Sequence, residues 1–191
     1  MVIIRVVEDN INDITNIDQS SATSKTRYLV QRKSRDYPIE PFRRAVCLFG
    51  GNAESTDNEP LDTLKRELGE ELPSDLVPSI LSSLQFVGTS MNAQTAELLG
   101  KAEPYAFMCA CYEATLSAKQ VKASFQNEIN DKEGNHALLS KEELMEEEKY
   151  AWGYDSVMST YFGSRVKHFC KGVTVTKLSN DDLKDWTPPA L

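Results

Sequence analysis

The segment from Gly50 to Glu71, GGNAESTDNEPLDTLKRELGEE, ends in three carboxylates that a helix would place on one face. At about 100° per residue, Glu67, Glu70 and Glu71 fall within roughly 100° of arc. Like charges at these spacings each weaken a helix by about 0.2–0.5 kcal/mol. An uncompensated triplet is therefore a poor structural choice, whereas a bound divalent cation would reverse the sign of the repulsion.

The same helix is expected to have an apolar stripe about 110° away from its acidic face. Four leucines form this stripe: Leu61, Leu64, Leu68 and Leu72. Asp57 or Asn58 is suitably placed to cap the N-terminus, with Pro60 in the first turn. We expect this helix to dock through one face and to present the other.

Two glycines, Gly50 and Gly51, follow the apolar run 45–49 (AVCLF). This order predicts a buried strand that leads into a loop whose backbone closely approaches another group. Carbonyl oxygens in such a loop are hard ligands that suit magnesium or manganese.

At these positions the chain resembles the Nudix box, G-x5-E-x7-R-E-U-x-E-E-x-G-U, where U is aliphatic. Gly51, Glu54 and the run 66–71 (RELGEE) carry the resemblance, and the R-E-U-x-E-E core matches at every specified position. The loop has one extra residue, so the first glutamate of the box falls on Asn58. The terminal glycine of the box falls on Pro73.

The resemblance implies the α/β/α sandwich of Nudix proteins, with a mixed β-sheet. It covers about residues 25 to 165. We expect a single domain over residues 1–191, in which the N-terminal strand and the C-terminal tail are extensions.

The resemblance also implies roles for the residues of the box. Glu70 and Glu71 would be the main metal ligands, with Glu67 completing the site or acting on water. A carbonyl of Gly50 or Gly51 would add an oxygen, and Gly50 would shape the loop. Arg66 is expected to orient Glu67 or Glu54 through a bidentate pair rather than to touch substrate.

The general base is left open between two parts of the chain. Glu67 is one candidate, and Glu133, or more weakly Glu128, is another because in several relatives a later loop supplies a glutamate. Glu133-Gly134 is equally well interpreted as an acidic turn. Candidate phosphate contacts, each also interpretable as an ordinary surface charge, are Arg27, Arg32 and Arg44.

Two classes of function follow from these residues. The first is a metal-dependent pyrophosphohydrolase that uses Mg²⁺ or Mn²⁺ to cleave the phosphoanhydride of a nucleoside diphosphate linked to another moiety. The second is a binding module that keeps the fold and senses a nucleotide-like ligand. A diphosphoinositol polyphosphate substrate would need a strongly basic pocket, which the net charge of −8 disfavours.

The composition limits the binding partners and the cellular location that we expect. A sequence pI of about 4.9 argues against a nonspecific nucleic-acid or anionic-membrane surface. The longest apolar runs are far shorter than the roughly 20 residues of a membrane span. The cysteines show no zinc or disulfide spacing. A cytoplasmic setting is the default expectation, and a homodimer is compatible with the sequence.

The hydrophobic pattern predicts the remaining elements. Strands are expected at 2–7, 26–33, 85–90, 104–115 and 135–139, with an edge strand at 173–176. Helices are expected at 76–84 and 156–166, and a capping box at Ser140 and Glu143 predicts a further helix start. Residues 9–24 and 117–130 are expected to be loops or connections.

Overall fold

The computed structural model describes residues 1–8, 26–94, 105–125, 134–163 and 176–178. Its strands are β1 (Val2–Val7), β2 (Thr26–Lys33), β3 (Val46–Cys47), β4 (Gln85–Gln94), β5 (Tyr105–Ser117), β6 (Gly134–Ser140) and β7 (Thr176–Leu178). Its helices are α1 (Pro60–Glu71), α2 (Val77–Ser82), α4 (Ala118–Phe125), α5 (Lys141–Glu146), α6 (Tyr154–Phe162) and the short 3-10 helix η1 (Glu40–Phe42).

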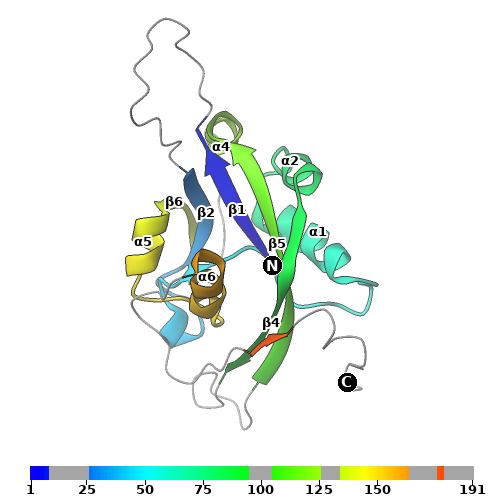
Figure 1. Ribbon diagram of the computed structural model, residues 1–191, viewed down its shortest axis with the longest axis vertical. Coiled ribbons are helices and arrows are strands. Elements are labelled where there is room, and N and C mark those ends of the chain that lie inside the picture. The colour runs from blue at the N-terminus through cyan, green and yellow to red at the C-terminus, as the bar shows by residue number, and fades with distance from the viewer. Residues whose placement is uncertain (9–25, 95–104, 126–133, 164–175, 179–191) are drawn as a thin grey trace, which may run out of the picture.

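The strands form one mixed sheet in the order β3-β2-β1-β5-β4-β7, and β6 also pairs with β2 (Figure 1). β1 runs parallel to β5, and the other named strand pairs are antiparallel. The register sets Ile4 opposite both Leu29 and Ala114. Because directly opposed residues point to the same face of a sheet, these three side chains lie together in one apolar layer.

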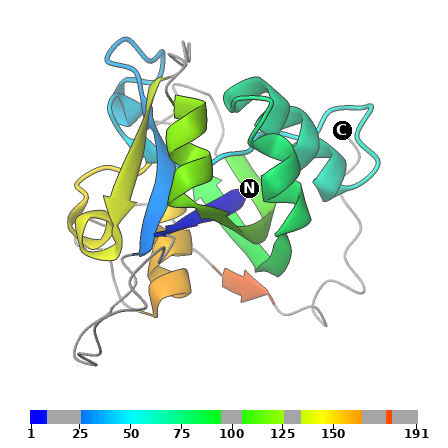
Figure 2. The same cartoon turned by 90° about the horizontal axis from the view of Figure 1, so that it is seen from above.

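Helices cover both faces of the sheet (Figure 2). Leu64 and Leu68 of α1, Ile80 of α2 and Val121 of α4 are buried in one core cluster, together with Phe49. Side chains of α6 and of the segment before it are buried in a second cluster: Tyr150, Ala151, Tyr154, Val157 and Met158. This arrangement confirms the predicted α/β fold with a mixed sheet between helical layers.

Most predicted elements are present, with small changes in their bounds. β1 and β2 have the predicted limits, and Ser140 and Glu143 form the predicted capping box at the start of α5. β7 lies at the edge of the sheet, although residues 173–175 lie outside the described part of the chain. The loop predicted for residues 9–24 lies outside it as well.

The structure corrects the prediction for the segment after Ser117. Instead of a plain connection, residues 118–125 form α4. Only two of its described side chains, Val121 and Ser124, are buried. Such a sparse apolar pattern gives a weak helix signal, and packing on the sheet supplies most of the stability of a short helix.

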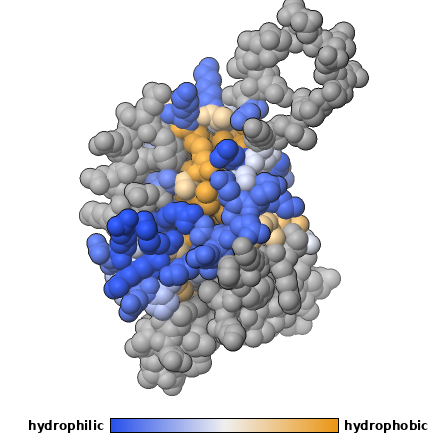
Figure 3. Space-filling view, turned by 90° about the vertical axis from the view of Figure 1, so that its left-hand side faces the viewer, coloured by the Kyte–Doolittle hydropathy of each residue, from blue (hydrophilic) through white to orange (hydrophobic). Residues whose placement is uncertain are grey.

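Among the described residues, no helix has the length and apolar character needed to cross a membrane. The large apolar side chains that are exposed in this part of the chain are Phe86, Val87 and Leu138. Figure 3 shows one face of the molecule, where an apolar strip has hydrophilic side chains beside and below it.

Candidate functional site

The acidic helix is α1, and the predicted leucine stripe holds it against the sheet. Leu64, Leu68 and Leu72 are buried, and Leu61 packs against the same cluster. The helix begins at Pro60, which therefore lies in the first turn as expected. The predicted cap is wrong, because the N-cap residue is Glu59 and it makes no side-chain capping hydrogen bond.

Asp57, one of the two predicted caps, instead accepts hydrogen bonds from the loop before α1 and from side chains of α1. Its Oδ2 accepts hydrogen bonds from the backbone N–H of Glu54 at 2.9 Å, from the Thr63 hydroxyl at 2.9 Å and from Arg66 Nη2 at 3.2 Å. Its side chain is only 7% exposed. The Glu54 N–H, with further help from Thr63 and Arg66, lowers the pKa of the Asp57 carboxyl against the opposing effect of burial.

Arg66 is held on several sides by this loop and by its own helix. Nη2 also donates to the carbonyl of Asn52 at 2.8 Å. Nη1 donates to Glu67 Oε1 at 2.8 Å and lies 3.5 Å from a carboxylate oxygen of each of Glu54 and Glu70. The hydrogen bonds to Asp57 and then to Glu67 raise the pKa of Arg66. With both terminal nitrogens occupied, this guanidinium is arranged to orient neighbouring groups.

Arg66 thus pairs with Glu67, one of its two expected partners, and the second carboxylate that it hydrogen-bonds is Asp57 rather than Glu54. Glu54 lies at the edge of the arrangement, with its side chain 60% exposed. Asn58, which takes the first glutamate position of the box, donates its backbone N–H to Asp62. The signal that could have identified Asp57 is its adjacency to Asn58, since the extra loop residue makes the position uncertain by one.

Glu67 lies directly against the glycine loop. A Cβ added at Gly51 would overlap the Glu67 carboxylate. The Glu67 side chain is 16% exposed and is paired with Arg66. Gly51 is therefore needed for the close approach that the sequence predicted, and the group that approaches is Glu67.

Gly50 contributes its amide to the same helix. Its backbone N–H donates to Glu71 Oε2 at 2.9 Å. Gly50 has φ of +129°, which side-chain-bearing residues rarely adopt, and a Cβ there would collide with the backbone of Met1. Glu70 differs from Glu67 and Glu71, because its side chain is 62% exposed.

The donor set of α1 fits a hard divalent cation, because Glu67, Glu70 and Glu71 supply carboxylate oxygens from one helix segment. In their present conformations, no three acidic, histidine or cysteine side chains of the described residues are grouped closely enough to hold an ion. Glu67 is turned toward Arg66 and Glu71 toward Gly50. A bound ion would draw the three carboxylates closer together, and Arg66 and Gly50 each contact only one oxygen of Glu67 and of Glu71.

The three arginines predicted to contact phosphate are not grouped. Arg32 Nη2 lies 2.6 Å from Glu147 and its Nη1 donates to the carbonyl of Arg44, so these two meet at one end of β2. Arg27, at the other end, donates to the carbonyl of Leu138. Residues 27 and 32 are an odd number of positions apart and about 16 Å apart along the strand, so their side chains leave opposite faces of β2. Glu133 and Glu128 lie outside the described residues.

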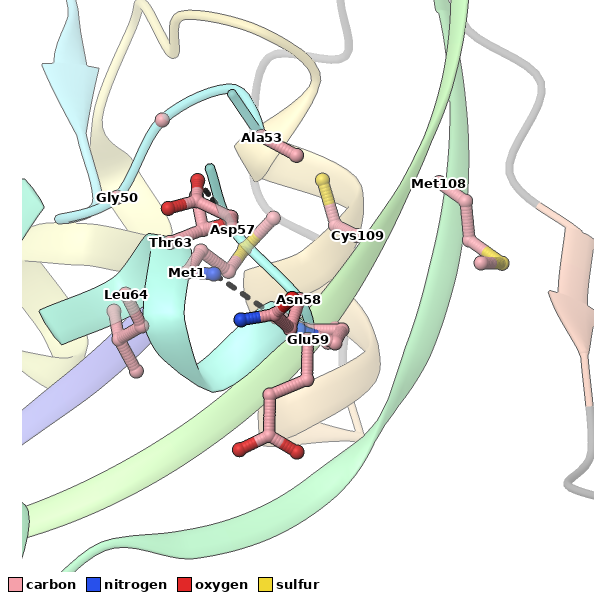
Figure 4. A pocket seen from close by; sticks show the side chains of 13 residues that line it. Met1, Gly50, Ala53, Asp57, Asn58, Glu59, Thr63, Leu64, Met108 and Cys109 are labelled. Atoms are coloured by element: carbon pink, nitrogen blue, oxygen red, sulfur yellow. Dashed lines mark hydrogen bonds between the residues drawn. The ribbon is translucent and has the colours of Figure 1, made fainter. Parts of the chain in front are cut away.

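A cavity of about 300 Å³ adjoins the first turns of α1 (Figure 4). Gly51 and Thr63 line it, and Thr63 precedes Glu67 by one helical turn. Burial raises the pKa of Cys109 to about 12, so this lining thiol is neutral near pH 7. The other lining residues are Met1, Gly50, Ala53, Asp57, Asn58, Glu59, Pro60, Leu64, Met108 and Ala110.

The solved structures that are similar to this chain include two hydrolases. One is a Nudix hydrolase from M. smegmatis, RenU, with a TM-score of 0.37 and 12% identity over 74% of this chain and 68% of that chain. The other is the Ap4A hydrolase of C. elegans, with a TM-score of 0.35 and 13% identity over 74% of this chain and 83% of that chain. No protein-family model and no curated protein sequence matches the chain. The role of the acidic helix must therefore be argued from the residues of this chain.

Proposed function

We propose that this protein is a Nudix-type, metal-dependent pyrophosphohydrolase that cleaves the phosphoanhydride of a nucleoside diphosphate linked to another moiety. The observation that carries the proposal is the position of Glu67. Arg66 pairs with its carboxylate at 2.8 Å, and Gly51 leaves the space that this carboxylate fills. Like charges crowded on one helix face are unfavourable without a counter-ion, and a bound cation would relieve this repulsion.

Glu67, Glu70 and Glu71 would hold Mg²⁺ or Mn²⁺, with the Gly51 carbonyl as a further ligand. Bound divalent ions neutralise phosphate oxygens and lower the pKa of water. Within the protein, Asp57 fixes Arg66 and Arg66 fixes Glu67, so that Glu67 can accept a proton from the attacking water. Gly50 holds the Glu71 carboxylate beside the same loop.

The cavity supports a nucleoside as the linked group. Its described lining combines apolar side chains with the carboxylates of Asp57 and Glu59, and the amino group of Met1 donates to the carbonyl of Ala110. Asp57 is paired with Arg66, so Glu59 is the lining carboxylate that would repel a densely phosphorylated inositol. A neutral base or sugar would meet no such repulsion, and its diphosphate would extend one helical turn toward Glu67.

The test is hydrolysis of a panel of nucleoside diphosphate derivatives and diphosphoinositol phosphates, with magnesium and with manganese. We expect release of phosphate products from a nucleoside derivative that depends on the metal. The Glu70→Gln/Glu71→Gln double variant should lose this activity and bind Mn²⁺ more weakly in calorimetry. Glu40→Gln removes a charge from an 82% exposed side chain of η1, and it should leave both unchanged.

The same panel separates the enzyme from a binding module. A binding module would take up a nucleoside diphosphate derivative with magnesium and release no phosphate product over hours on any substrate. That result would overturn the hydrolase proposal. Equal Mn²⁺ affinity in the wild-type protein and the double variant would overturn the assignment of the metal ligands.

A further inference from the structure

The side chain of His136, in β6, contacts the C-terminal end of the acidic helix α1. The neighbouring β6 residues Ala137 and Leu139 pack against the core cluster on the α6 side of the sheet. Because side chains alternate along a strand, His136 points to the opposite face, where α1 lies. Its Nε2 lies 3.1 Å from the carbonyl oxygen of Glu71.

The chemistry of this contact fixes the donor. A carbonyl oxygen can only accept, so Nε2 of His136 carries the hydrogen. Glu71 is the last residue of α1. The last four carbonyls of a helix have no partner within the helix. The imidazole thus supplies a hydrogen bond at a helix end where the helix itself supplies none.

A second contact fixes the ring of His136. It stacks on Phe49 with the ring centroids 5.6 Å apart and an angle of 11° between the planes. Phe49 is fully buried and immediately precedes Gly50, whose N–H holds the Glu71 carboxylate. One imidazole therefore contacts both segments that meet at Glu71, namely the strand end before the glycine loop and the helix end.

We propose that His136 is a positioning residue for metal binding. It fixes the position of Glu71, at the end of α1, relative to the loop at Gly50. This inference rests on the proposed function, because it assigns the position of a proposed metal ligand. His136 acts on the backbone of Glu71 and touches neither metal nor substrate. Its loss should therefore weaken metal binding without removing any ligand.

The experiment is calorimetric titration of Mn²⁺ into the substrate-free protein and two variants at His136. His136→Phe keeps a ring to stack on Phe49 and removes the donor. His136→Gln places an amide N–H near the position of Nε2 and serves as the conservative control. Partners that orient a ligand typically change metal affinity by about 10–100-fold, and we expect about tenfold weaker binding for His136→Phe. His136→Gln should stay within about threefold of wild type, because it keeps the donor.

Phe49→Leu gives an independent measurement if His136→Phe does not fold. It removes the flat ring and leaves the hydrogen bond, and we expect about threefold weaker binding of Mn²⁺. Wild-type affinity in a folded His136→Phe or Phe49→Leu protein would overturn the inference, as would a His136→Gln protein as weak as His136→Phe. A wild-type protein that binds no Mn²⁺ would overturn the proposed metal function as well, so the two failures are distinguishable.

Discussion

Asp57 and Arg66 lie nine residues apart in the chain and meet across the glycine loop, with Asp57 Oδ2 3.2 Å from Arg66 Nη2. The same oxygen also receives the Glu54 N–H and the Thr63 hydroxyl. One nearly buried carboxylate thus closes the loop, anchors it to the first turn of α1 and holds the arginine that pairs with Glu67. These contacts make Asp57 the principal support of the candidate site.

We expect Asp57→Asn to lower turnover by about 10–100-fold, the usual effect of losing a partner that orients an active group. Glu54→Gln should have a much smaller effect, because the Glu54 side chain is 60% exposed and lies 3.5 Å from Arg66. Asn58→Ala should be close to wild type. Turnover and KM of the three variants on one substrate provide the measurement. A larger loss in Glu54→Gln than in Asp57→Asn would show that the loop closes through Glu54 during the reaction.

Asp57 should also make the stability depend on pH. Its pKa is lowered by the hydrogen bonds that it accepts from the Glu54 N–H, Thr63 and Arg66. A carboxyl with a folded-state pKa below its unfolded value of about 3.9 stabilises the protein above that pH. This contribution is lost as the pH falls through the folded-state pKa.

We therefore expect wild type to exceed Asp57→Asn in unfolding free energy by a full margin at pH 6, and by a shrinking margin below about pH 4. Urea unfolding followed by circular dichroism at several pH values gives the two curves. Glu40→Gln provides a matched control, because Glu40 is exposed and its ion pair with Arg43 is long, at 3.7 Å. A margin that stays constant down to pH 3 would contradict an ionised Asp57 at the centre of the loop.

Gly51→Ala should separate the site from the fold. The added Cβ must displace the Glu67 carboxylate, which is the mobile end of a side chain, so the protein should fold with a stability within about 0.5 kcal/mol of wild type. Turnover should fall by about 10–100-fold, because Glu67 leaves its position beside Arg66.

Gly69→Ala is the matched control for Gly51→Ala. Gly69 lies within α1, and a Cβ there would meet nothing within 4 Å. This variant should be more stable by about 0.5–1 kcal/mol, because alanine is the better helix former, and it should keep its activity. Thermal unfolding and turnover of the two variants check both expectations. Wild-type turnover in Gly51→Ala would mean that the observed Glu67 conformation is not the one used in the reaction.

Helix α1 could be predicted in detail because several signals agree there. The leucine stripe, Pro60 and the acidic face all specify the same helix, and the core cluster that receives the leucines confirms it. The choice between Asp57 and Glu54 could not be made from the sequence. Spacing gives the distance of each carboxylate from Arg66 along the chain, but not which of them the loop turns inward.

His136 shows the same limit at longer range. No residue close to His136 in the sequence has a spacing that would suggest a functional role for it. Its contact with Glu71 joins residues that are 65 positions apart, and it depends on the register of β6 on β2. Pairings between distant segments are decided by the packed sheet and leave no local pattern in the sequence.

The last prediction concerns the general base. Glu67→Gln keeps the shape of the side chain and an oxygen that can accept from Arg66, but it removes the ability to take a proton. General-base assistance contributes about 10²–10⁴-fold, so kcat should fall by that range while substrate affinity changes little. Glu133→Gln should give the same pattern only if the later loop supplies the base. Steady-state kinetics of both variants, with substrate binding measured separately by calorimetry, distinguish the two carboxylates. A Glu67→Gln protein with wild-type kcat and a Glu133→Gln protein with a large loss would move the base to Glu133 and leave Glu67 as a ligand alone.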